Sequence, residues 1–254
     1  MLNVSKFSSS VAIMSACAAV SLTAAHADYK IQERTTIESP QFKAMSESLS
    51  PQQRSHLGKS SMSLLTGAPI TSTVFTNGKK VRTDAGPATF IFDPSLKRTY
   101  VLNRGTHTYS VAAYNTQAGQ MLGATHPVIK DMGRSKSILG HPTHRYHIVA
   151  SLPGMTGTQV SGDVWAATDL PQIGNSAFNS GPASILESAM RSIKGLPMQL
   201  SMTVAGSPLG NVFVHSTVVS VSKTRLAPSV FSIPAGYALR NASPRGLGMG
   251  AFGR

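Results

Sequence analysis

From residue 70 onward, the chain is a series of short runs rich in β-branched and aromatic residues, separated by turn residues. Such runs predict antiparallel strands, because a short turn can join neighbouring strands only when they run in opposite directions. The dipeptide Asn77-Gly78 predicts a tight hairpin, since both of its turn positions must tolerate positive φ. We expect strands at 71–76, 79–84, 88–93, 98–103, 107–113, 144–150, 159–167, 198–204 and 211–221.

Alternation within these runs predicts a sheet with one apolar face. Phe90 with Phe92, and Tyr100 with Leu102, are spaced by two residues, the repeat that places strand side chains on the same side. The run 198–204 has the same pattern over its whole length, with Met198, Leu200, Met202 and Val204 separated by polar residues. A long curved antiparallel sheet with one apolar face follows, and that face needs a cover.

Two segments are predicted to be the helices that cover it. In 40–65, apolar residues have helical spacing, and Ser50 with Gln53 predicts a capped second helix start. In 183–194 one helical stripe ends before Gly195 and contains Ile185, Leu186, Ala189, Met190 and Ile193. We expect a long loop at 115–133 and a disordered, basic, glycine-rich tail at 240–254.

The N-terminus is typical of an export signal. Lys6 precedes an uncharged apolar stretch at 7–25, and Ala25-His26-Ala27 resembles a signal-peptidase site. We expect residues 1–27 to be a signal peptide cleaved after Ala27, and residues 28–239 to form one periplasmic or secreted domain. Alternatively, Cys17, the only cysteine, is acylated and anchors a lipoprotein. No later stretch is long and apolar enough for a membrane span.

The formal net charge is +13, and the basic residues are scattered rather than clustered. A solvated basic surface explains this charge, although such a surface also attracts anionic membranes. A nucleic-acid partner is not expected, because the sequence shows no basic face interleaved with stacking aromatics.

The sequence contains motifs that suggest catalysis or metal binding, but their surroundings do not support either function. His141, His144 and His147 have three-residue spacing, but Gly140 and Pro142 oppose a helix there. On a strand, His144 points away from the other two, so no metal is expected. The acids form no recognisable pair, and no nucleophile elbow is present. We therefore expect no catalytic residues and no cofactor, and a hydrolase is the less favoured alternative.

Several short motifs together resemble a family of exported bacterial proteins similar in fold to the periplasmic lipoprotein carriers LolA and LolB. The resemblance covers about Val74 to Tyr237 and implies a mainly β fold with α, a half-barrel whose concave face is covered by helices and can hold acyl chains. The motifs are Lys80-Val81-Arg82-Thr83-Asp84, Tyr100-Val101-Leu102, Ile138-Leu139-Gly140-His141-Pro142, Asp163-Val164-Trp165, Gly195-Leu196-Pro197-Met198 and Phe231-Ser232-Ile233-Pro234-Ala235-Gly236-Tyr237.

Candidate ligand-binding residues follow from the apolar pattern and this resemblance. Trp165 is either a packing anchor or a ligand-stacking residue. Arg82 and Arg191 are candidates for contact with an anionic headgroup, and Phe231 and Tyr237 are expected to pin the chain end to the sheet. The predicted cavity lining is Phe90, Phe92, Tyr100, Leu102, Trp165, Ile185, Met190, Ile193, Met202 and Val204.

The leading functional hypothesis is a non-catalytic periplasmic protein that binds a hydrophobic small molecule, a lipid, an acyl chain or a lipoprotein. The alternative is an envelope interaction protein that docks on a partner or an anionic membrane through its basic surface.

Overall fold

The computed structural model describes residues 28–56, 62, 66–113, 127–151, 157–173, 192–207 and 210–240. The predicted signal peptide, the tail from residue 241 and most of the predicted helix at 183–194 lie outside these residues. So do the candidate residues Ile185, Met190 and Arg191.

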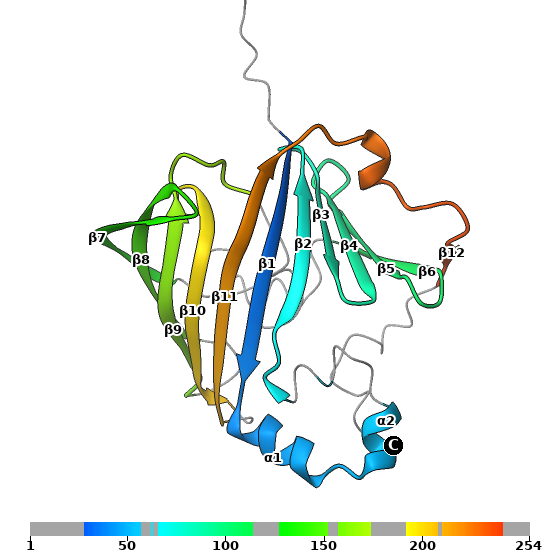
Figure 1. The fold of residues 1–254 in the computed structure, drawn as a ribbon, viewed down its shortest axis with the longest axis horizontal. Helices are drawn as coiled ribbons and strands as arrows, with labels where there is room; N and C mark the ends of the chain where they lie inside the picture. The colour runs from blue at the N-terminus through cyan, green and yellow to red at the C-terminus, as the bar shows by residue number, and fades with distance from the viewer. Residues whose placement is uncertain are drawn as a thin grey trace, which may run out of the picture.

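The described strands form one open sheet of twelve strands, in the order β12-β6-β5-β4-β3-β2-β1-β11-β10-β9-β8-β7. Figure 1 shows β1 at the centre, between a meander of β2 to β6 and a meander of β7 to β11. Only β12 and β6 pair in parallel. The strands are β1 (Tyr29–Glu38), β2 (Ile70–Thr76), β3 (Val81–Ala85), β4 (Ala88–Asp93), β5 (Arg98–Asn103), β6 (Thr108–Ala113), β7 (Val128–Ile138), β8 (His141–Ser151), β9 (Gln159–Ala167), β10 (Leu196–Ser207), β11 (Gly210–Lys223) and β12 (Ala238–Leu239).

The mainly β fold class and the antiparallel meanders are confirmed, and each predicted strand has a counterpart. The Asn77-Gly78 hairpin differs in its turn. Thr76 pairs with Val81, so the loop has the four residues 77–80. The side chain of Asn77 accepts hydrogen bonds from the amides of Lys79 and Lys80, and this local bonding replaces the two-residue turn.

Three strands were not predicted: β1, β7 and the two-residue strand β12. β1 lies before the region where we expected strands, and β7 begins at Val128, so the predicted loop at 115–133 is wrong for 128–133. β7 is an edge strand, mostly exposed, with a register shift between Asp131 and Ser135. Because neither of its faces is consistently buried, its sequence has no alternation to detect.

The helices α1 (Pro40–Ser48) and α2 (Pro51–His56) lie at one end of the sheet (Figure 1). The predicted second start is confirmed, because the amide of Gln53 donates to the Ser50 hydroxyl and the Gln53 side chain accepts from the Ser50 amide. No residue of α1 is buried. In the described residues, this segment is therefore not shown to cover the apolar face, and residues 57–61 and 63–65 of it lie outside the described residues. Among the described helices, none is long and apolar enough to cross a membrane.

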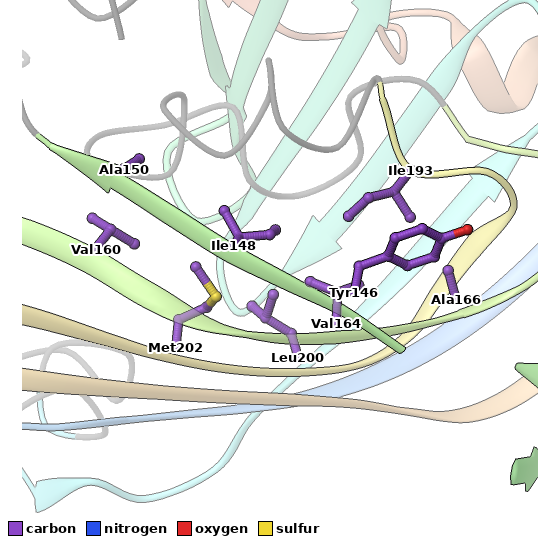
Figure 2. Packing of buried hydrophobic residues seen from close by; sticks show 9 residues of the cluster. All are labelled: Tyr146, Ile148, Ala150, Val160, Val164, Ala166, Ile193, Leu200 and Met202. Carbon is purple, nitrogen blue, oxygen red and sulfur yellow. The ribbon is translucent and has the colours of Figure 1, made fainter. Parts of the chain in front are cut away.

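One face of the sheet, called the core face, carries Ile31 of β1 and the side chains in register with it. A first apolar cluster lies on β8, β9 and β10 (Figure 2) and contains Tyr146, Ile148, Ala150, Val160, Val164, Ala166, Ile193, Leu200 and Met202. A second cluster lies around β1 and contains Ile31, Val74, Val81, Ala167, Leu170, Leu196, Met198 and Val218. These strands thus carry apolar side chains on the core face. The sheet is not apolar on one side only, as predicted, because Ile91 of β4 and Leu102 of β5 are each 1% exposed and lie on the opposite face.

The chain end returns to the sheet, as predicted for Phe231 and Tyr237. The 3-10 helix η2 (Pro228–Phe231) lies against β3, and Phe231 is buried. The ring of Tyr237 meets the ring of His107 edge to face, with centroids 5.5 Å apart. β12 then adds the last strand beside β6.

Candidate functional site

Two half-buried aromatic side chains lie on the core face at β4. Phe90 pairs with Thr83 and Phe92 pairs with Val81, and these residues of β3 are in register with β2 and β1. Phe92 also packs against the second cluster. The core face therefore presents aromatic surface on the β4 side and a buried aliphatic cluster on the β8 to β10 side.

The candidates Ile193, Met202 and Val204 belong to the first cluster. Ile193, just before β10, is 1% exposed and packs over β8 (Figure 2), while Val204 packs at the border of the cluster. Met202 pairs with Gly162, where an added Cβ would overlap the carbonyl oxygen of Ser201. Glycine thus permits the close approach of β9 and β10 that seats Met202. Ligand contact by these residues stays a prediction.

The sheet does not bring Tyr100, Leu102 and Trp165 onto the core face. Phe90 pairs with Val101, so Tyr100 and Leu102 point to the opposite side, called the outer face. Trp165 alternates with Val164 and Ala166, which both belong to the first cluster. The register of β4 with β5 and the alternation along β9 therefore show that the predicted lining residues do not all lie on one face.

The centre of the core face contains a buried acid that the sequence analysis did not single out. Glu33 of β1 is 8% exposed, pairs with Ser72 of β2, and accepts a hydrogen bond from the Ser216 hydroxyl of β11. Burial raises the pKa of Glu33, and hydrogen bonds from Ser216 and Ser72 only partly oppose that effect. One signal could have revealed it: Glu33 interrupts the alternating positions Tyr29, Ile31, Thr35 and Ile37.

The outer face of β7 to β10 is polar. Asp163 accepts hydrogen bonds from Arg145 at 2.6 Å and from His147 at 3.0 Å. Burial alone would raise the pKa of Asp163, but these bonds outweigh it and lower that pKa. Lys136 lies over the Trp165 ring, and partial burial together with the positive charge of Arg145 lowers the pKa of Lys136.

Arg82 has a structural role on the outer face. Its guanidinium forms two hydrogen bonds with Asp84, at 2.9 and 3.1 Å, and donates a third to the carbonyl of Val230. These contacts attach η2 to β3. Arg82 and Phe90 lie on opposite faces, so Arg82 is not on the core face. Contact of Arg82 with a headgroup stays a prediction.

The three histidines lie on β8 and have separate surroundings. His141 is 2.8 Å from Asp169, and His147 is paired with Asp163. His144 pairs with Ala166 of the first cluster. Among the described residues, no three potential ligands are placed to share a metal ion.

Comparisons with known proteins give little beyond a distant structural likeness. No family model and no curated protein matches the chain. Structural matches include an uncharacterised conserved protein from Thermus thermophilus, with 8% identity, a TM-score of 0.43, and coverage of 85% of this chain and 91% of that one. Another is a LolA superfamily protein from Nitrosomonas europaea, with 10% identity, a TM-score of 0.25, and coverage of 82% and 90%. Because both TM-scores are low, we infer the function from the residues of this chain.

Proposed function

We propose that this protein is a non-catalytic binder of a hydrophobic molecule, such as a lipid, an acyl chain or the lipid part of a lipoprotein, and that the core face is its binding surface. The observation that supports this most is that two apolar clusters and the half-buried rings of Phe90 and Phe92 lie on one face between β8 and β4. Apolar contact would stabilise the complex by about 25 cal/mol per Å² buried, before ordering costs.

The proposed place of action is the periplasm or the extracellular space. It rests on the signal-like residues 1–27 and on the sequence resemblance to the lipoprotein carriers. The intact mass of the exported protein tests it. Cleavage after Ala27 gives a soluble chain beginning at Asp28, whereas an acylated chain beginning at Cys17 gives an anchored lipoprotein.

A matched pair of variants tests the binding surface. Phe90 and Tyr100 are half-buried aromatic residues on adjacent strands, but they lie on opposite faces. We expect Phe90→Ala to weaken the binding of a fluorescent fatty acid about tenfold, and Tyr100→Ala to leave the affinity within about twofold. Equal losses in the two variants, or no binding by the unaltered protein, would contradict the proposal.

A second candidate function is docking on an anionic membrane through the outer face. The observation that favours it is the basic edge strand β7, where Lys130, Arg134 and Lys136 are all exposed. Binding to vesicles that contain phosphatidylglycerol, lost in high salt and absent with phosphatidylcholine alone, would support this function. Binding unaffected by salt would count against it.

A further inference from the structure

Glu33 lies at the middle of the sheet. β1 is flanked by β2 and β11, and Glu33 pairs with Ser72 on one side and Val218 on the other. A register shift between Gln32 and Glu33 interrupts the pairing with β11 at this point. The carboxylate therefore lies on the core face between the first cluster, on β8 to β10, and the aromatic residues of β4.

The hydrogen-bond partners of Glu33 are neutral hydroxyls. Ser216 donates to its carboxylate, Ser72 supplies a second hydroxyl, and the hydroxyl oxygens of Thr35 and Ser216 are 2.8 Å apart. No Lys, Arg or His of the described chain forms an ion pair with Glu33. Within the part of the chain that the structure describes, the ionised carboxylate thus has hydrogen-bond donors around it but no ion-pair partner.

Apolar packing alone does not account for an acid in this position. Its core-face neighbours include its register partner Val218, and also Ile31 and Val74, which form the adjacent pair of β1 and β2; none of these can compensate a charge. Moving a carboxylate out of water is costly unless a cation or several donors compensate it. The neighbouring core-face positions of β2 and β11 in the described chain, Ser72, Val74, Ser216 and Val218, are uncharged. A bound cation would balance the negative charge of the Glu33 carboxylate.

We propose that Glu33, supported by Ser72 and Ser216, binds the ammonium group of a cationic amphiphile whose chain lies on the core face. This assignment rests on the proposed function, since it adds a polar anchor to the same binding surface. A charge-assisted hydrogen bond from an ammonium to a carboxylate is stronger than one from a neutral hydroxyl. An anionic headgroup is excluded at this position, because two negative charges would repel each other in a poorly solvated site.

The test compares three amphiphiles with the same chain, namely dodecylamine, dodecanol and dodecanoate. Each competes with a fluorescent hydrophobic probe for the purified protein at pH 8. We expect the unaltered protein to bind dodecylamine at least tenfold more tightly than dodecanol, and dodecanoate more weakly than either. Glu33→Gln keeps the shape and removes the charge, so it should bind dodecylamine and dodecanol equally.

Glu38→Gln is the matched control, because Glu38 is exposed and lies on the outer face of the same strand. It should keep the preference for dodecylamine. Thermal melting of each variant establishes that it is folded. A preference that survives in Glu33→Gln, or equal binding of dodecylamine and dodecanol by the unaltered protein, overturns this assignment alone. If none of the three amphiphiles displaces the probe and the probe itself does not bind, the proposed function fails as well.

Discussion

The ammonium of Lys136 on β7 lies 4.1 Å from the centre of the Trp165 ring on β9, so the contact spans the intervening strand β8. Lys136 also donates a 2.6 Å hydrogen bond to the side chain of Gln199 on β10. One exposed lysine thus ties the edge strand of the sheet to two inner strands.

Replacing Lys136 should change the environment of Trp165. We expect Lys136→Ala to shift the tryptophan emission to longer wavelength and to lower the free energy of unfolding by about 0.5–1 kcal/mol, the size of an exposed cation–π contact. Trp165 is the only tryptophan, so the signal has one source. Lys130→Ala, on the same strand, should leave the emission unchanged. An unaltered spectrum in Lys136→Ala would refute the contact.

Replacing Arg82 should loosen the chain end. Arg82→Met removes the ion pair with Asp84 and the hydrogen bond to Val230 that attaches η2. We expect a loss of about 1.5–3 kcal/mol in unfolding free energy and faster proteolysis within 224–240. Fatty-acid affinity should hardly change, because Arg82 faces away from the core face. Weaker ligand binding with unchanged stability would instead support the predicted headgroup contact of Arg82.

Adding one methyl group at Gly162 should be severely destabilising. The new Cβ of Gly162→Ala would overlap the carbonyl oxygen of Ser201 and lie 2.6 Å from the sulfur of Met202. Separating β9 from β10 to relieve this contact should lower the free energy of unfolding by about 3 kcal/mol, measured by urea denaturation. Gly105→Ala, where the nearest atom lies 3.4 Å away, should cost less than about 1 kcal/mol. Equal stability of the two variants would show that the strands are not packed so closely.

The raised pKa of Glu33 predicts a loss of stability with rising pH. Between the ordinary value of 4.5 and the higher value in the folded protein, the folded state holds the proton and the unfolded state releases it. Stability should therefore fall by up to about 1.4 kcal/mol per pH unit in this window, and Glu33→Gln should remove that fall.

The lowered pKa values of Asp93 and Asp163 act in the opposite direction. Their stabilisation is present above the ordinary value of 3.8 and is lost as the pH falls through the lower values of the folded protein. The effect of Glu33 lies above pH 4.5 and the effect of the two aspartates lies below pH 3.8. The free energy of unfolding, measured by urea denaturation from pH 3 to 8, therefore separates them. Identical profiles for the unaltered protein and Glu33→Gln would show that Glu33 is not desolvated.

The sequence alone determined nine of the twelve described strands, because side-chain alternation and turn chemistry are local properties. β4, β5 and β9 occur at their predicted residues. The strands β1 and β7 were not predicted, for different reasons. β7 is a polar edge strand with no consistently buried face, and β1 shows an apolar alternation that Glu33 interrupts.

Tertiary structure decided which alternating side chains share a face. Phe90 with Phe92 and Tyr100 with Leu102 show the same spacing in the sequence, yet the register of β4 against β5 places the two pairs on opposite faces. The phase of one strand relative to the next depends on the residues in the turn, and a shift of one residue reverses every side chain. The pairing of β1 with β2 and β11 likewise brought Glu33, Ser72 and Ser216 together from three strands, and no local pattern in the sequence could show that contact.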